Sequence, residues 1–263
     1  MTGIFVEINE GPGCFVATAI HDGHQLRDEL HPVINLDTQE RLREEDPFTA
    51  LWAEMAKTSI IGKYSRFEVD LNRPREKAVY IKPEDAWGLE VWKVPLPEDI
   101  ITRSIQKYEE FYSRLKKLFD KKIKEDGGIL VYDFHSYNHK REGSTKPGAD
   151  PALNPEINLG TENINIEKFD PVVKALIKSL SSFNYKNRTL DVRENIKFKG
   201  GYFSKWIYDN YPDNSCVIAI EIKKFFMDEW TGIPDYKEIK LLKTAFEKSV
   251  PDVLQVFKEA LKS

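Results

Sequence analysis

The sequence predicts an α/β protein in which a mixed, largely parallel sheet is flanked by helices. Short runs of apolar and β-branched residues, typical of strands, alternate along the chain with longer amphipathic segments, typical of helices. Several of the strand-like runs are apolar at almost every position, as in strands that are buried on both faces of a parallel sheet. The chain contains no internal repeat and no linker, so residues 1–263 are expected to form a single domain.

The first strand is predicted at Cys14–Ile20, a continuous apolar run. A helix is expected after Asp37, because Asp37 and Glu40 have the spacing of a capping box. Pro47 should end that helix. A second helix is predicted to begin at Asp46, with Pro47 at its first position, where a missing N–H group costs no hydrogen bond.

The next strand is predicted at Ser65–Leu71, where apolar and polar residues alternate with a period of two. Pro74 then stops regular pairing because it has no N–H group to donate. Residues 81–99 are rich in proline and tryptophan and are expected to form an irregular loop or hairpin. The clearest helix is Ile101–Asp126, which has apolar residues at helical spacing and is followed by two glycines that end it.

The remainder of the chain shows the same alternation. Asp170 is expected to cap a helix whose first position is Pro171. Two long polar stretches are expected to be loops, and loops of this length are usually functional in a compact domain. Strands are predicted at residues 128–136 and 216–227, and helices at residues 169–183 and 236–261. The two loops are residues 137–165 and 195–215.

Composition excludes several classes of function. The net charge is −4, from 39 basic and 43 acidic residues that are interspersed, so no nucleic-acid partner is expected. No apolar run approaches the roughly 18 residues of a membrane span, and the first residues lack the features of a signal peptide. Cys14 and Cys216 lie in apolar runs and are expected to be buried free thiols, which suits the reducing cytoplasm. The oligomeric state is left open.

Polar groups follow each of the predicted buried strands. His21, Asn72 with Arg73, His135 and Glu221 stand at the ends of four such runs. The carboxyl ends of parallel strands meet at one edge of a sheet, where ligands bind in open α/β folds. We therefore expect these side chains to form one site.

These residue types indicate a zinc hydrolase. Two imidazoles and a carboxylate can hold Zn²⁺ and leave a position for water, whose pKa the metal lowers to about 7. A separate carboxylate can then carry a proton to the leaving amine. An arginine such as Arg73 can bind a substrate carboxylate through two hydrogen bonds. Asp133 is two residues before His135 and could orient its imidazole. Arg66 is either a second anion-binding group or a partner for Asp70.

The chain resembles a known family, the N-formylglutamate amidohydrolases, within the wider zinc-carboxypeptidase and aspartoacylase-like superfamily. The resemblance covers roughly Val16 to Glu229, and the order of its motifs along the chain also matches. The residues that carry it are "IHDG" at 20–23, "EEDPFTALW" at 44–52, "SRFEVDLNRP" at 65–74, "VYDFHSYN" at 131–138, "INLGT" at 157–161, "FKGGY" at 198–202 and "IAIEIKKFFMDE" at 218–229.

The resemblance implies a phosphorylase/hydrolase-like fold of the zinc-carboxypeptidase kind and assigns roles to single residues. His21 and His135 become ligands of Zn²⁺ or another divalent metal, and Glu221 becomes the proton-carrying base. The substrate would contact Asn72, Arg73, Gly200 and Gly201. The acidic third ligand would be Asp46, with Glu45 as its neighbouring alternative. His24 is a further alternative, because it stands three residues after His21, where the superfamily often has an acid.

The reaction implied is hydrolysis of the amide of an N-acyl amino acid, a small anionic substrate such as N-formyl-L-glutamate, to formate and the free amino acid. "IHDG" stands where the family has "PHSG", so the pocket wall near His21 is expected to differ, and the acyl group and the amino acid stay open. Two alternatives remain: a zinc carboxypeptidase or peptidoglycan-amide hydrolase of the same fold, and a non-catalytic relative that binds an anion or a partner. The presence of both histidines, Arg73 and Glu221 favours an enzyme.

Overall fold

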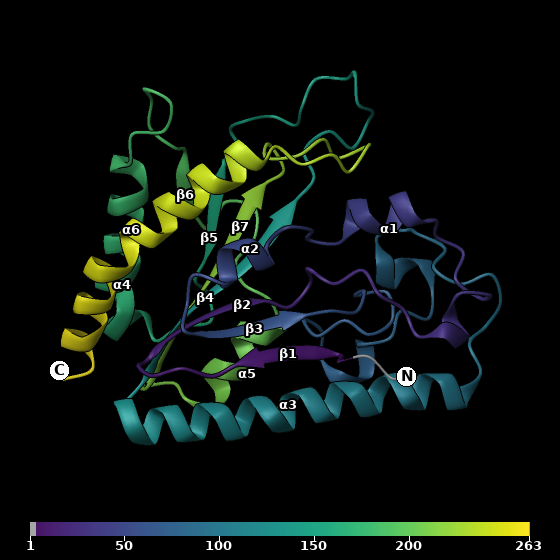
Figure 1. Cartoon of the computed structure of the whole chain (residues 1–263), viewed down its shortest axis with the longest axis horizontal. Coiled ribbons are helices and arrows are strands. Elements are labelled where there is room, and N and C mark those ends of the chain that lie inside the picture. The colour runs from purple at the N-terminus through teal and green to yellow at the C-terminus, as the bar shows by residue number, and fades with distance from the viewer. Residues whose placement is uncertain (1–3, 263) are drawn as a thin grey trace.

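The computed structural model describes residues 4–262, which are built around a seven-stranded sheet in the order β1-β3-β2-β4-β7-β5-β6 (Figure 1). The neighbouring strands β3, β2, β4 and β7 are parallel. β1 is antiparallel to β3, and β5, which pairs in parallel with β6, is antiparallel to β7. The predicted α/β class with a mixed, largely parallel sheet is therefore confirmed. The strands are β1 Val6–Asn9, β2 Phe15–Ala19, β3 Thr58–Gly62, β4 Ile129–Tyr137, β5 Ile157–Gly160, β6 Val192–Glu194 and β7 Ser215–Lys223.

Helices cover both faces of the sheet. In Figure 1, α3 runs along one side of the sheet, and α4 and α6 lie together on the other. The α-helices are α1 Thr38–Glu44, α2 Ala50–Ala53, α3 Glu98–Asp126, α4 Ile166–Ser182, α5 Tyr202–Asn210 and α6 Tyr236–Ala260.

The two faces of the central strands belong to two separate apolar cores. In β4, Leu130, Tyr132 and Phe134 pack with α2, α4 and α6, whereas Ile129 and Val131 pack with α3 and α5. All nine residues of β4 are buried. Neighbouring side chains along a strand point to opposite faces, so a strand that is covered on both sides is largely apolar. The carboxylate and the imidazole of β4, from Asp133 and His135, lie between the middle of the strand and its carboxyl end.

The strand predicted at Ser65–Leu71 is wrong: this segment is a succession of turns. Phe67, Val69 and Leu71 face apolar clusters, which accounts for the alternation. Glu68 and Asp70 are also fully buried, and they accept hydrogen bonds from Arg27 and Tyr80, which lie in other segments. Directly upstream lies β3, which the prediction missed, as it missed β1, β5 and β6. Because β3 runs parallel to β2, the segment after β3 still lies at the edge of the sheet where β2 ends.

Several boundaries also differ from the prediction. The capping box of Asp37 and Glu40 is present at the start of α1, but no helix begins at Asp46; turns lead instead to α2, which begins at Ala50. Asn165 caps α4, five residues before Asp170. The last predicted strand ends at Lys223 as β7, and the two predicted loops contain β5 and α5.

The remaining predicted elements match closely. The strand at Cys14–Ile20 is β2, the strand at 128–136 is β4, and the helices at 101–126 and 236–261 are α3 and α6. Both cysteines are buried free thiols, as expected. Among the described residues, none of the helices combines the length and the hydrophobicity needed to cross a bilayer.

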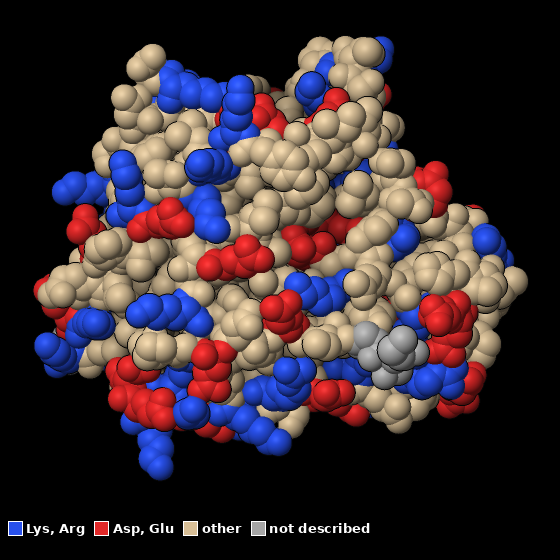
Figure 2. Space-filling view, in the orientation of Figure 1, with Lys and Arg blue, Asp and Glu red and all other residues tan. Residues whose placement is uncertain are grey.

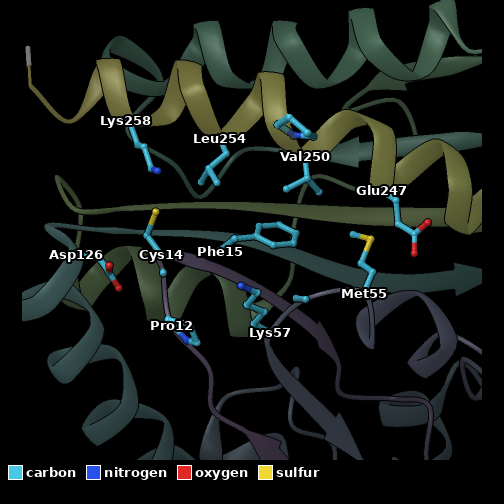
Figure 3. A pocket seen from close by; sticks show the side chains of 13 residues that line it. Pro12, Cys14, Phe15, Met55, Lys57, Asp126, Glu247, Val250, Leu254 and Lys258 are labelled. Atoms are coloured by element: carbon cyan, nitrogen blue, oxygen red, sulfur yellow. The ribbon is translucent and has the colours of Figure 1, made fainter.

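Cavities are found at both edges of the sheet. One of about 560 Å³ lies at the amino-terminal edge, where α6 passes over the start of β2 (Figure 3). Another of about 350 Å³ lies at the carboxyl edge of the parallel strands. The residues that follow β2 and β3, and those at the ends of β4 and β7, all contribute to the carboxyl-edge cavity, which contains the candidate site.

Candidate active site

The carboxyl-edge cavity contains a group of three side chains that could hold a metal ion. His21 follows β2, His135 lies on β4, and Asp46 lies in the turn between α1 and α2. One potential ligand atom from each residue lies within 4.8 Å of the other two, and all three residues are buried. The backbone N–H of Asp46 donates to the carbonyl oxygen of His21 at 3.0 Å, which fixes the turn against the end of β2. The structure thus brings together the three residues expected to be ligands.

Both imidazoles are oriented by a second carboxylate. His21 Nε2 lies 2.7 Å from Asp70 Oδ1, and His135 Nε2 lies 3.0 Å from Asp133 Oδ2. This leaves the Nδ1 atoms facing Asp46, with His135 Nδ1 3.0 Å and His21 Nδ1 3.4 Å from Asp46 Oδ2. An imidazole that binds a metal through one nitrogen usually has its other nitrogen held in this way.

The two orienting carboxylates are themselves fixed. Asp133 accepts a hydrogen bond of 2.5 Å from Thr18 Oγ1 on the neighbouring strand β2. Asp70 accepts hydrogen bonds from Arg66, from Tyr80 Oη and from the backbone N–H of Asn72. Four elements of the fold therefore hold the histidine rings in place before any ligand binds.

The donor set fits a divalent cation. His21 Nδ1 is buried and has no hydrogen-bond partner among the described residues, which is costly for a polar atom. Burial by itself would raise the pKa of Asp46, but the imidazoles of His135 and His21 outweigh it and hold that pKa well below its usual value. Burial likewise opposes a charged His135, yet the carboxylates of Asp133, Asp46 and Glu221 raise its pKa well above the usual value. The three buried side chains thus offer two imidazole nitrogens and a carboxylate, the donor types that bind Zn²⁺.

Glu221 lies beside this group. In the sheet it is the register partner of His135 on β4 and of Asn158 on β5. Burial, together with the nearby carboxylates of Asp46 and Asp133, raises the pKa of Glu221 to about 7, although His135 lowers it. Within residues 4–262, no side chain donates a hydrogen bond to Glu221, and Lys223 on the same strand face forms no ion pair with it. A carboxyl group that titrates near neutral pH suits general acid–base catalysis.

A buried lysine holds the turn that carries Asp46. Lys224 directly follows β7, and its Nζ donates to the carbonyl oxygens of Arg43 at 2.5 Å and Glu45 at 2.8 Å. These carbonyls lie at the carboxyl end of α1, where helical partners are lacking. Burial lowers the pKa of Lys224 to about 8, while Asp46 and other nearby carboxylates raise it. Lys224 therefore connects the end of β7 to the backbone directly before the candidate ligand Asp46.

The alternative ligands Glu45 and His24 lie outside the group of three. His24 Nδ1 is 2.5 Å from Glu45 Oε2, and the other carboxylate oxygen of Glu45 accepts a hydrogen bond from Ser65. Arg41 donates to the carbonyl oxygen of His24. Glu45 and His24 are thus partners of each other, and neither lines the cavity.

The expected substrate-binding residues divide into two sets. Asn72, Arg66, Gly200 and Gly201 line the cavity, whereas Arg73 does not. The Arg73 guanidinium lies 5.7 Å from the centre of the Tyr80 ring and 3.9 Å from Asp70 Oδ2. Arg66 was expected to be either a partner for Asp70 or a second anion-binding group. It pairs with Asp70 at 2.7 Å and also lines the cavity.

Glycine at position 201 is required by close packing. A Cβ atom at this position would overlap the side chain of Asn72, whose Oδ1 accepts the backbone N–H of Phe203 at 2.8 Å. This bond leaves the Asn72 amide N–H₂ group for a ligand. Gly200 has φ of +119°, a backbone conformation that L-residues rarely adopt. The glycine pair therefore lets the segment before α5 approach Asn72 closely.

Sequence reasoning did not identify every residue of the site. Asp70 was considered only as a partner of Arg66, and Lys224 and Trp87 were not considered, although both line the cavity. Asp70 follows the alternating pattern of its segment, which made it resemble a solvent-facing strand residue. Lys224 directly follows Lys223, the last residue of β7. A charged residue at the end of an apolar run is the signal that could have identified Lys224 as part of the site.

Comparisons with known proteins identify a family and similar folds. The sequence profile of a family described as N-formylglutamate amidohydrolase matches residues 13–227. A search of curated proteins found no match. The crystal structure of N-formylglutamate amidohydrolase from Ralstonia eutropha JMP134 is similar with a TM-score of 0.72 and 15% identity, over 98% of both chains. A gene product of Agrobacterium tumefaciens is similar with a TM-score of 0.67 and 18% identity, over 94% of this chain and 95% of that one. At these identities the structural likeness shows the fold alone.

Proposed function

The chain belongs to the N-formylglutamate amidohydrolase family, and we propose that it is a metal-dependent hydrolase of N-acyl amino acids, with N-formyl-L-glutamate as the reference substrate. The reaction would add water across the amide and release formate and the free amino acid. One observation carries the proposal: two imidazoles oriented by carboxylates present their Nδ1 atoms to Asp46, beside the buried carboxyl group of Glu221.

His21, Asp46 and His135 would hold the cation, and Zn²⁺ suits a set of two imidazoles and one carboxylate. A cation held there would lower the pKa of a coordinated water to about 7 and polarise the amide carbonyl. Asp70 and Asp133 contribute by keeping both Nδ1 atoms aimed inward.

Glu221 is the group that moves protons. As a carboxylate it accepts a proton from the attacking water while the water oxygen forms its bond to the acyl carbon. As the carboxylic acid it then gives that proton to the amide nitrogen, and the C–N bond breaks to release the amine. A pKa raised to about 7 permits both steps near neutral pH.

Substrate orientation is assigned to the part of the cavity lining that comes from the segment after β3. Arg66 and the amide of Asn72 line the cavity and can bind the carboxylate of the acyl amino acid. Arg73 was expected to share this role. In the structure its guanidinium lies near the Tyr80 ring and Asp70, outside the cavity lining, so we assign carboxylate binding to Arg66 and Asn72 alone.

An amide-hydrolysis assay tests the proposal. Protein loaded with zinc should release formate from N-formyl-L-glutamate, should lose this activity on chelation, and should regain it when zinc is added back. Equal turnover of N-formyl-L-glutamate and the analogue whose α-carboxylate is a carboxamide would remove the assigned carboxylate contact. A zinc-loaded protein that hydrolyses neither of them would contradict the proposed function.

A further inference from the structure

One cationic side chain of the carboxyl-edge cavity differs from the others in its partners. Six cationic residues line the cavity, and Lys197 is exposed and donates from Nζ to one neutral oxygen, Asn154 Oδ1, at 2.7 Å. No carboxylate forms an ion pair with it within residues 4–262. The other five are paired with carboxylates or with backbone carbonyls: Arg66 with Asp70, Arg43 and Arg141 with Glu44, Lys199 with Glu162, and Lys224 with the carbonyls of Arg43 and Glu45.

The backbone at Lys197 is fixed by a buried asparagine. Asn158 Oδ1 accepts the N–H groups of Ile196 at 3.0 Å and Lys197 at 2.8 Å, and Asn158 Nδ2 donates to the carbonyl oxygen of Phe198 at 2.7 Å. Asn158 is fully buried and is the register partner of Glu221 on β7. The position of Lys197 is thus set relative to Glu221 through a single side chain and the sheet.

Two aromatic rings guide the side chain of Lys197. Its Nζ lies 5.2 Å from the centre of the Tyr137 ring and 5.6 Å from that of Phe198. The two rings contact each other edge to face at 5.5 Å. Such cation–π contacts attract an ammonium group without neutralising it, so its charge stays available to a ligand.

The electrostatic surroundings favour an added anion. Burial lowers the pKa of Lys197, and the positive charges of Arg141 and Lys223 lower it further, against a smaller opposing effect of Glu221. An anion bound at Nζ would offset this repulsion. Lys197 is exposed at the cavity and can therefore be reached from it.

We propose that Lys197 determines specificity by binding a second carboxylate, that of an acidic amino-acid side chain in the substrate. Arg66 and Asn72 come from the segment after β3, whereas Lys197 is held beside β5, on the other side of β2, β4 and β7 in the sheet order. A substrate with two carboxylates can contact both walls, with its amide between them near Glu221. This inference rests on the proposed function, because it names the substrate class of the same site.

Binding of two amino acids that carry no N-acyl group tests Lys197 separately from the proposed reaction. Zinc-loaded wild-type protein, Lys197→Met and Lys205→Met are titrated with L-glutamate and L-glutamine by calorimetry. Lys205 is a matched control, because it lies on α5 outside the cavity lining and pairs with Asp209 on the surface. Wild type and Lys205→Met should bind glutamate about 10-fold or more tightly than glutamine, the scale of a charge-assisted hydrogen bond. Lys197→Met should bind the two about equally.

Equal binding of glutamate and glutamine by wild type, failure of both to bind, or a preference that survives in Lys197→Met would each overturn the assignment. In the hydrolysis assay, Lys197→Met should lower kcat/KM for N-formyl-L-glutamate about 10-fold or more and leave N-formyl-L-glutamine nearly unchanged. If wild type hydrolyses both formyl compounds at similar rates, the role of Lys197 fails and the proposed function stands. If it hydrolyses neither, the proposed function fails, and the titration still decides the role of Lys197.

Discussion

The cavities at the two edges of the sheet differ in size and in chemistry. The amino-edge cavity, at about 560 Å³, exceeds the carboxyl-edge cavity, at about 350 Å³. Figure 3 shows the amino-edge cavity with the side chains of Phe15, Met55, Val250 and Leu254 around it. The carboxyl-edge cavity is surrounded by imidazoles, carboxylates and cationic groups, most of them linked by hydrogen bonds to one another.

Buried charge, rather than volume, therefore distinguishes the cavity that contains the candidate site. Removing carboxylates such as Asp46 and Asp133 from water is costly, and the fold offsets that cost with a network in which nearly every polar atom is bonded. The charged residues that line the amino-edge cavity are exposed at the surface and face water. Strand direction accounts for the asymmetry, because the segments after parallel strands bring their polar groups to one edge only.

Substitution of a candidate metal ligand at the carboxyl edge should have the largest effect on zinc content and activity, and substitution at the amino edge should have none. His21→Ala and His135→Ala are each expected to retain less than about a tenth of the wild-type zinc and to lose activity in proportion, because two ligands rarely hold zinc. Elemental analysis and circular dichroism measure metal content and folding. The paired control is Leu254→Ala at the amino edge, which should keep full zinc occupancy. Wild-type zinc content in both folded histidine variants would place the metal elsewhere.

Glu221→Gln should abolish proton transfer while sparing the metal. We expect kcat to fall about 10²–10⁴-fold with zinc content nearly unchanged, because the amide keeps the shape but accepts no proton. Steady-state kinetics on zinc-loaded protein would show this. A variant that loses stability but keeps its kcat would identify Glu221 as a structural residue.

The pH profile gives a further test of Glu221. A general base acts as the carboxylate, so kcat/KM should rise with pH through its pKa and then level off. That pKa is raised to about 7 by burial, and a bound cation would lower it, so the rising limb is expected at or below pH 7. Rate measurements from pH 4 to 9 would locate it. The limb should disappear in Glu221→Gln, and its persistence there would assign it to another group.

Asn substitutions of the orienting carboxylates should have intermediate effects. Asp70→Asn and Asp133→Asn are each expected to weaken zinc binding or activity about 10–100-fold, because each imidazole loses the charge that holds its Nε2–H. Competition with a chromophoric chelator measures the affinity. Asp126→Asn at the amino edge removes a surface carboxylate and should change nothing. Equal affinities for all three variants would show that the carboxylates only support the fold.

The smallest effect is expected from enlarging the amino-edge cavity. Leu254 is half-buried, so Leu254→Ala should lower the free energy of unfolding by about 1–2 kcal/mol, below the range for fully buried leucines. Its kcat and KM should stay within about twofold of wild type. Urea denaturation and the hydrolysis assay measure the two quantities. A loss of activity without a loss of stability would connect this cavity to the reaction.

Sequence alone predicted the fold where burial leaves an unambiguous pattern. The sequence runs that form β2 and β4 have apolar residues on both faces, as expected for strands that are buried between two layers of helices. The Ser65–Leu71 prediction failed because Glu68 and Asp70 are buried acids, and sequence does not distinguish a buried ion network from a solvent-facing surface. The helix α5 was missed because the neighbouring glycines and Pro212 obscured a short amphipathic pattern.

The same reasoning applies to the site. His21, His135 and Glu221 were found because they stand at the ends of apolar runs. Asp46 followed from the family resemblance, since it lies in a turn with no periodic signal of its own. The roles of Asp70 and Lys224 depend on partners 49 and 179 residues away, His21 and the Glu45 carbonyl, and only the tertiary structure brings these together.

Anomalous diffraction at the zinc edge, from crystals of the zinc-loaded protein, would show directly whether His21, Asp46 and His135 hold the metal. We expect one strong peak at the carboxyl edge, about 2.0–2.2 Å from the Nδ1 atoms of His21 and His135 and from a carboxylate oxygen of Asp46. A peak between His24 and Glu45, a peak in the amino-edge cavity, or no peak at all in zinc-loaded crystals would contradict it.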